Sequence, residues 1–167
     1  MKNIAIRRVE ARDLVALLDI YNHFVTTTHI SFDVEPRTLE QRRVWFGSFA
    51  ETGRHQCFVA DRDGSAIGWA SSGRFKDRAA YDTSVETSVY LAPGEGGKGL
   101  GRRLYQTLLD ALAKEDVHRA FGGIAQPNEA SVGLHLAMGY RHVGTYSEVG
   151  RKFGKFWDVA WYEKPLG

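Results

Sequence analysis

One acidic residue in this chain is placed to do proton chemistry. Glu86 lies in residues 85–90, a run of mostly apolar side chains that predicts a largely buried strand. Burial raises the pKa of a carboxyl group, which would let Glu86 accept a proton near neutral pH. The alternative is a structural glutamate paired with an arginine. Glu86 lies on the strand that leads into a glycine-rich loop, and this position favours the role of general base over the structural role.

That loop is the second chemical signal. Residues 94–101 contain five glycines, and Lys98, Arg102 and Arg103 lie in or beside them. Glycine permits positive φ values, so successive backbone N–H groups can converge on an anion at the start of a helix. The loop therefore predicts a phosphate or pyrophosphate site, the alternative being a connection without a ligand. Gly99 after Lys98 excludes a P-loop, and the third glycine of the dinucleotide fingerprint is missing.

A third candidate segment follows the next predicted strand. Asn128 begins a helix, where an Asn cap is expected in any case, and Ser131 and His135 lie on the same helix at spacings that share a face. His135 is either a proton donor or a packed helical histidine. The remaining histidines are too dispersed to predict a metal site, and no Gly-x-Ser-x-Gly elbow indicates a serine hydrolase.

The elements that position these residues can be read from periodicity and caps. We expect strands at 4–9, 56–60, 66–72, 84–91 and 119–125, with two more at the end of the chain. Helices are expected from Asp13, from the capping box of Thr38 and Gln41 to Gly53, and over 99–115 and 129–138. This order predicts a single α/β domain over residues 1–167, with a mixed central sheet flanked by helices.

Composition limits the class of protein further. The chain has 167 residues, 43% of them apolar, and a formal charge of +2, which is too small to indicate nucleic acid as a partner. No apolar run reaches the length of a membrane span, and no targeting signal is recognisable. The single cysteine, Cys57, excludes an intrachain disulfide and is typical of a core residue in a reducing compartment. We therefore expect a cytoplasmic protein.

The loop and the later helix together resemble a known family. Gly99 and Gly101 match the last two fixed positions of Gln/Arg-x-x-Gly-x-Gly/Ala, the pyrophosphate loop of the GCN5-related N-acetyltransferases (GNAT), while Gly96 stands where Gln or Arg is usual. Asn128, Ser131 and His135 resemble the family's second cofactor-binding segment. The resemblance implies a GNAT fold and acetyl-CoA as cofactor, with no metal.

A narrower resemblance covers residues 4–164. The ordered segments 21–23, 76–82, 85–90, 134–140 and 150–154 resemble the phosphinothricin N-acetyltransferase branch of the family. That branch implies a homodimer. It also implies acetyl transfer to the α-amino group of a small acceptor such as phosphinothricin, methionine sulfoximine or methionine sulfone.

The resemblance also implies roles for individual residues. Catalysis is assigned to Glu86 and His135. Acetyl-CoA binding is assigned to Ser88, Val89, Tyr90, Gly96, Gly97, Lys98, Gly99, Leu100, Gly101, Arg102, Asn128 and Ser131. Acceptor binding is assigned to Phe32, Phe75, Lys76, Arg78, Val85 and Thr87. The two cations suit an acceptor that carries a carboxylate, the alternative being an ordinary solvated loop.

The implied reaction is direct transfer in a ternary complex, with Glu86 taking the ammonium proton directly or through water. A backbone N–H near Val89 or Tyr90 would stabilise the oxyanion, and His135 or a water would protonate the thiolate. Two alternatives stay open. One is a GNAT enzyme for a polyamine, an aminoglycoside or a protein N-terminus, although the basic residues at 74–78 argue against a polyamine. The other is a non-catalytic acyl-CoA-binding module, which the presence of Glu86 disfavours.

Overall fold

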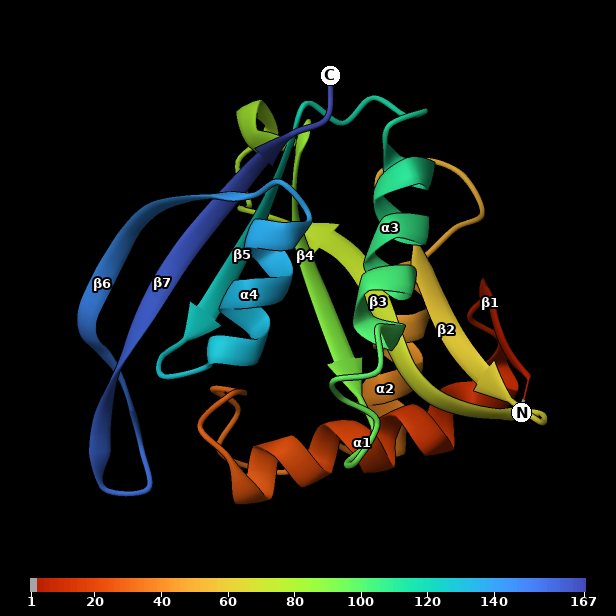
Figure 1. Cartoon of the computed structure of the whole chain (residues 1–167), viewed down its shortest axis with the longest axis horizontal. Coiled ribbons are helices and arrows are strands. Elements are labelled where there is room, and N and C mark those ends of the chain that lie inside the picture. The colour runs from red at the N-terminus through yellow and green to blue at the C-terminus, as the bar shows by residue number, and fades with distance from the viewer. Residues whose placement is uncertain (1–2) are drawn as a thin grey trace.

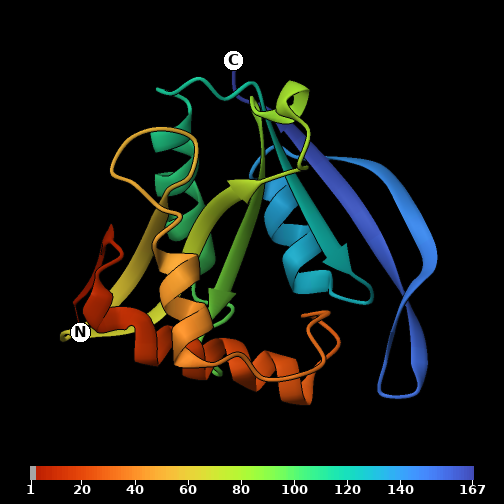
Figure 2. The same cartoon turned by 180° about the vertical axis from the view of Figure 1, so that it is seen from behind.

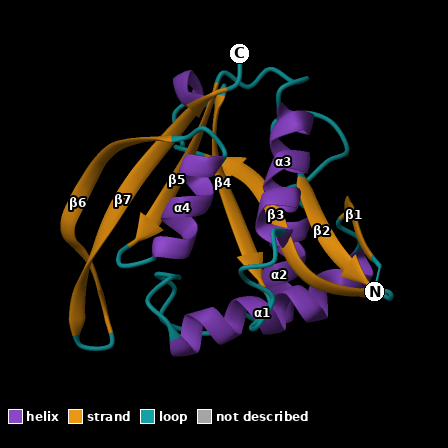
Figure 3. Cartoon of the chain, viewed as in Figure 1, coloured by secondary structure: helices purple, strands orange, loops and turns teal. Residues whose placement is uncertain are grey.

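The computed structural model describes residues 3–167, which form one seven-stranded sheet with helices on both faces (Figures 1 and 3). The strands are β1 (Ile4–Arg8), β2 (Cys57–Arg62), β3 (Ser65–Arg74), β4 (Ser84–Leu91), β5 (Arg119–Ala125), β6 (Arg141–Lys152) and β7 (Lys155–Pro165). Their order across the sheet is β1-β2-β3-β4-β5-β7-β6, and β4 with β5 is the parallel pair. The predicted α/β class with a mixed sheet is confirmed.

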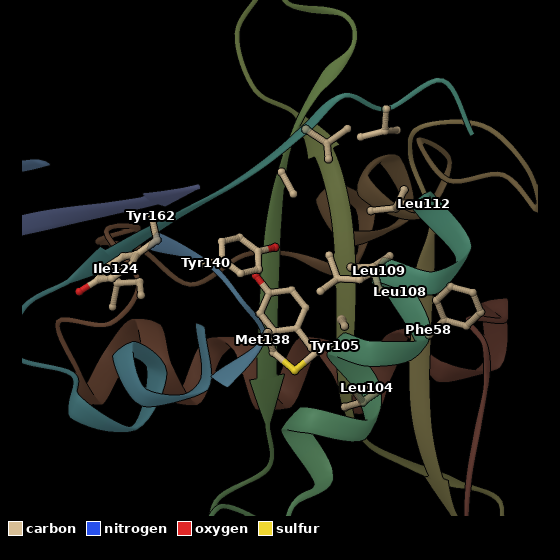
Figure 4. Packing of buried hydrophobic residues seen from close by; sticks show 14 of the residues in the cluster. Phe58, Leu104, Tyr105, Leu108, Leu109, Leu112, Ile124, Met138, Tyr140 and Tyr162 are labelled. Atoms are coloured by element: carbon tan, nitrogen blue, oxygen red, sulfur yellow. The ribbon is translucent and has the colours of Figure 1, made fainter. Parts of the chain in front are cut away.

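The four α-helices cover the sheet in pairs. They are α1 (Leu14–Thr27), α2 (Leu39–Phe46), α3 (Leu100–Leu112) and α4 (Glu129–Ala137). The helices α3 and α4 lie on one face and α1 with α2 on the other, as Figures 1 and 2 show from the two sides. Four leucines of α3 follow each other at i+4 spacing: Leu100, Leu104, Leu108 and Leu112. They are buried against β2, β3 and β4, in the larger of two core clusters (Figure 4). None of the helices within residues 3–167 is long and apolar enough to cross a membrane.

Two helix starts test the capping predictions. The box of Thr38 and Gln41 is present, with both reciprocal hydrogen bonds, although α2 ends at Phe46 and well before Gly53. Asp13 precedes α1 as predicted, but its side chain does not cap that helix. It accepts hydrogen bonds from Arg7 at 2.8 Å and from the Glu10 N–H at 2.8 Å. Burial alone would raise the pKa of Asp13, but the hydrogen bonds from Arg7 and the Glu10 N–H, together with the charges of Arg7 and Arg12, outweigh burial and lower the pKa.

The sheet opens between its two parallel strands. Residues Ser84 to Glu86 pair with Arg119 to Phe121, and the ladder stops there. β4 continues along β3 to Leu91 and β5 continues along β7 to Ala125, so each strand keeps one partner while the two diverge (Figure 1). The inner edges of residues 87–91 and 122–125 therefore carry backbone groups that no strand pairs. This opening lies next to the glycine-rich loop and to Glu86.

Candidate active site

A cavity of about 510 Å³ lies at the opening on the side of α3 and α4. Ten of the twelve residues predicted to bind cofactor line it: Ser88, Val89, Tyr90, Gly96, Gly97, Gly99, Gly101, Arg102, Asn128 and Ser131. The other two do not. The Lys98 ammonium group donates to the Gly94 carbonyl at 2.7 Å and lies near Glu95, and the Leu100 side chain is buried in the core.

The loop has the backbone geometry that an anion site needs. Gly97 and Gly99 have φ values of 75° and 76°, and Gly99 is the residue directly before α3. Side chains other than glycine rarely adopt this left-handed conformation. The first N–H groups of α3 have no partner within the helix and carry its positive end, and Arg102 adds a full charge beside them. The site is therefore suited to a phosphate or pyrophosphate group.

Glu86 lies on the other face of the sheet, the face toward which Ser88 and Tyr90 also project. It borders two adjoining cavities of about 580 Å³ each, with Tyr146 and Trp161 shared between them. Within residues 3–167 no hydrogen bond or ion pair engages its carboxylate, so the structure provides no arginine partner for it. Burial raises the pKa of Glu86 above its ordinary value. The group is thus prepared to accept a proton and is not neutralised by a neighbour.

The cavity lined by the glycine-rich loop meets one of the two Glu86 cavities, the one that Phe32 lines, at the opening between β4 and β5. Ser88, Tyr90, Gly123 and Ala125 border both of them. A ligand anchored at the start of α3 and a second ligand beside Glu86 would therefore lie in adjoining cavities. Residues 3–167 hold no cluster of His, Cys, Asp and Glu side chains arranged for a metal ion.

The six predicted acceptor residues do not all reach Glu86. Phe75 and Lys76 line one of its cavities and Phe32 lines the other. Arg78 is exposed in the loop after β3 and borders neither. The remaining two residues, Val85 and Thr87, flank Glu86 in β4, and alternation turns their side chains to the opposite face, so the structure corrects this part of the prediction.

Thr87 instead belongs to a buried hydroxyl cluster under α3 and α4. Its Oγ1 lies 2.5 Å from the Tyr105 hydroxyl, 2.8 Å from the Tyr140 hydroxyl and 3.2 Å from the Phe121 carbonyl oxygen. Figure 4 shows Tyr105 and Tyr140 next to each other at this place. The cluster fills the core directly behind the point where β4 and β5 separate.

His135 completes this cluster. Its exposed fraction is 4%, its Nδ1 donates to the Ser131 carbonyl at 2.7 Å, and its Nε2 lies 2.9 Å from the Tyr105 hydroxyl. A carbonyl can only accept, so the proton is on Nδ1 and Nε2 accepts from Tyr105. Burial lowers the pKa of His135, which favours the neutral ring. Of the two alternatives, the geometry favours the packed structural histidine.

Sequence reasoning missed several residues of the site. Tyr105 is hidden in the leucine stripe of α3, and Tyr146 and Trp161 come from β6 and β7, far along the chain. One signal was available. Two consecutive glycines inside a strand indicate close approach, and a Cβ at Gly122 would lie 2.5 Å from His135 Nε2. Gly123 likewise lies under the ring of Trp161, 3.0 Å from where its Cβ would be.

Comparison with known proteins defines the class to which this fold and site belong. The family model for the acetyltransferase (GNAT) domain matches residues 6–161. The chain therefore belongs to the GNAT family, and it is an N-acetyltransferase.

Individual relatives narrow the comparison. The chain is 56% identical to a phosphinothricin N-acetyltransferase of Streptomyces coelicolor over 98% of this chain and 96% of the relative. It is 33% identical to an L-methionine sulfoximine/L-methionine sulfone acetyltransferase of Pseudomonas aeruginosa, over 97% and 94% of the two chains. Among solved structures, a phosphinothricin acetyltransferase of Sinorhizobium meliloti in complex with AcCoA superposes with a TM-score of 0.92, at 29% identity over 98% and 89% of the chains.

A substitution separates the two roles of His135. We expect His135→Leu to lower the free energy of unfolding by about 1–3 kcal/mol, because the buried Tyr105 hydroxyl loses its acceptor. Turnover should change by less than about threefold, since the ring is not the proton donor. Denaturant unfolding and steady-state rates measure both, with His23→Leu on the exposed side of α1 as control. Unchanged stability with a loss of kcat of about a hundredfold would instead identify a general acid.

Proposed function

We propose that this chain is a cytoplasmic, single-domain enzyme over residues 1–167 that acetylates the α-amino group of a small amino acid. The acceptor would be of the phosphinothricin, methionine sulfoximine or methionine sulfone type, and the acetyl group would pass to it directly in a ternary complex. The observation that carries this proposal is the position of Glu86, an unpaired and partly buried carboxylate beside the junction of the two cavities. The names of the relatives support the acceptor class.

The cavity lined by the glycine-rich loop fits acetyl-CoA, which supplies an acyl thioester when bound. The glycines of residues 96–101, the start of α3 and Arg102 would hold its pyrophosphate. Asn128, whose side chain caps α4 by accepting from the Ser131 N–H, lines the far wall. Between them, the unpaired inner edge of residues 87–91 offers backbone hydrogen bonds to an extended, amide-bearing chain.

The same opening supports the chemistry of the transfer. Glu86, directly or through water, would accept the proton of the acceptor ammonium group, and its raised pKa brings it closer to the pKa of that proton donor. Backbone N–H groups of the unpaired β4 edge, near Val89 or Tyr90, would hydrogen-bond a carbonyl oxygen that lies in the opening. Positioning of two substrates by the same strand would then supply most of the rate.

The Glu86 cavity that Phe75 and Lys76 line favours an amphipathic amino acid as the acceptor. Aromatic rings form much of its wall, with Phe75 stacked on Phe121 at 4.2 Å between ring centroids and edge-on to Trp161. Lys76 is the cation at this wall, and Glu86 is the only acidic residue among its described lining residues. A polycationic acceptor would find little charge to pair with in such a cavity.

Replacement of the proposed base tests the mechanism. We expect Glu86→Gln to lower kcat by about 10²–10⁴-fold with the affinity for acetyl-CoA little changed. In the wild type, kcat/KM should fall as the pH drops through the raised pKa of Glu86, because a protonated carboxyl group cannot accept a further proton. The pH profile of the variant should lack this fall. Rates as a function of pH and acetyl-CoA binding measure both.

The matched control is Glu51→Gln, at an exposed position remote from the cavities. Ionised Glu86 destabilises the fold above its ordinary pKa, because burial favours the neutral form. Glu86→Gln should therefore be at least as stable as the wild type at neutral pH. Unchanged turnover in Glu86→Gln would remove this residue from the mechanism, and an unfolded variant would contradict the account of its burial.

A panel of amines tests the acceptor class through free-thiol release from acetyl-CoA. The panel contains phosphinothricin, methionine sulfoximine, methionine sulfone, common amino acids, spermidine and an aminoglycoside. We expect saturable turnover with the first three compounds and at least about a hundredfold lower kcat/KM for the two polycations, since Glu86 is the only acidic residue among the described residues that line this cavity. Turnover confined to spermidine or the aminoglycoside would overturn the acceptor assignment. Binding of acetyl-CoA with no turnover of any amine would favour a non-catalytic module.

We also propose a homodimer. The edge strand β6 and the turn after it expose large apolar side chains, among them Val149 at 56% and Phe153 at 56%. An exposed apolar edge strand favours pairing with a second copy. Light scattering at micromolar concentration should give twice the chain mass of 18.7 kDa, and Val149→Lys should shift it toward the monomer. A wild-type monomer at these concentrations would contradict the dimer.

A further inference from the structure

The most unusual charge in the molecule is Arg42, which lies in α2 away from the loop and from Glu86. Its exposed fraction is 5%, and its guanidinium carbon lies 3.4 Å from the ring centroid of Trp45 and 4.7 Å from that of Trp69. Within residues 3–167, its Nε and Nη2 atoms are buried without a hydrogen-bond partner, and no carboxylate pairs with it. Buried charges in proteins are normally paired, so this cation lacks the anion that its burial calls for.

Arg42 is among the residues that line a cavity of about 420 Å³, while its Nε and Nη2 atoms are themselves buried. Hydroxyl and amide donors line it, from Gln41, Ser71, Ser88 and Tyr90. The one acid on its wall, Asp33, is already engaged by Arg37 at 2.6 and 2.8 Å and by the Tyr21 hydroxyl at 2.5 Å. The cavity is therefore net positive and rich in donors, which suits an oxyanion such as a carboxylate or phosphinate group.

This cavity continues into the cavity of Glu86. Tyr21, Asp33, Ser88 and Tyr90 border both. Glu86 and Ser88 project from the same face of β4, two residues or roughly 7 Å apart. A small amino acid whose amine lies at Glu86 can thus reach past Ser88 with an oxyanion on its other end.

We propose that Arg42 is a binding residue for an oxyanion of the acceptor, held in a subsite formed by α2, β3 and β4. The inference rests on the proposed function, and it moves acceptor recognition from the exposed Lys76 and Arg78 toward a buried cation. Burial lowers the pKa of Arg42 to about 10, so the group stays cationic at neutral pH. The rings of Trp45 and Trp69 hold the guanidinium group in a fixed plane, which favours directed hydrogen bonds to one ligand.

The test compares acceptors that differ in one oxyanion. Phosphinothricin carries two, its α-carboxamide lacks the carboxylate, and norleucine lacks the phosphinate. We expect Arg42→Met to lower kcat/KM for phosphinothricin by about 10–100-fold. The wild type should prefer phosphinothricin over the analogue that lacks the oxyanion bound by Arg42, and the variant should lose this preference. That analogue also identifies which oxyanion occupies the subsite. Arg42→Lys should recover only part of the preference, because the ammonium group is not planar.

Arg43→Met is the matched control, since Arg43 is the next residue of α2 and is exposed. Equal losses on all three acceptors in Arg42→Met would show a purely structural arginine and would overturn the proposal. Tryptophan fluorescence gives a readout without turnover, because Trp45 and Trp69 contact Arg42. Phosphinothricin should bind with an affinity that falls about 10–100-fold in Arg42→Met and is unchanged in Arg43→Met.

Inorganic phosphate separates an acceptor subsite from a site for free anions. We expect phosphate to compete with phosphinothricin for the fluorescence change in the wild type. Phosphate binding that depends on Arg42 but does not compete would overturn the acceptor assignment. Absence of turnover with any amino acid would refute the proposed function, while the binding data would still decide the role of Arg42.

Discussion

The separation of β4 from β5 is the constraint on which the rest of this structure depends. Parallel pairing ends at Glu86 and Phe121, and beyond it each strand is held by its outer neighbour. The gap exposes backbone groups along one edge of β4, joins the cavities on the two faces of the sheet, and leaves Glu86 beside the junction. A fully paired sheet would satisfy more backbone hydrogen bonds, but it would separate the cavities on its two faces.

A buried cluster of polar side chains lies directly behind the gap. Thr87 Oγ1 lies 3.2 Å from the Phe121 carbonyl oxygen where the ladder stops, and its hydroxyl joins those of Tyr105 and Tyr140 in one hydrogen-bonded cluster. His135 extends this cluster to α4, and the missing side chain of Gly122 gives its ring room. Because every polar group in this chain of contacts has a partner, burial costs little and the two helices are fixed relative to the strands. The cofactor loop and the cap of α4 take their positions from these helices.

Local signals in the sequence predicted the fold class and the elements that carry the candidate site. The capping box of Thr38, the strand that carries Glu86 and the glycine loop were all readable, because each depends on neighbours in the chain. Contacts between distant segments were not readable. Nothing near Arg42 in the sequence indicates that Trp69 covers it, and nothing near His135 indicates that Tyr105 uses its lone pair. The expectation for Val85 and Thr87 was wrong for a different reason, since adjacent residues of a strand point to opposite faces.

The central claim is that donor and acceptor are bound at the same time, one from each face, and meet in the gap between β4 and β5. Initial rates measured while acetyl-CoA and an amino-acid acceptor are varied together test this claim most directly. The account predicts double-reciprocal lines that intersect, because both substrates must be present before the acetyl group moves. Parallel lines, together with an isolable acetylated enzyme, would show a covalent intermediate and would contradict it.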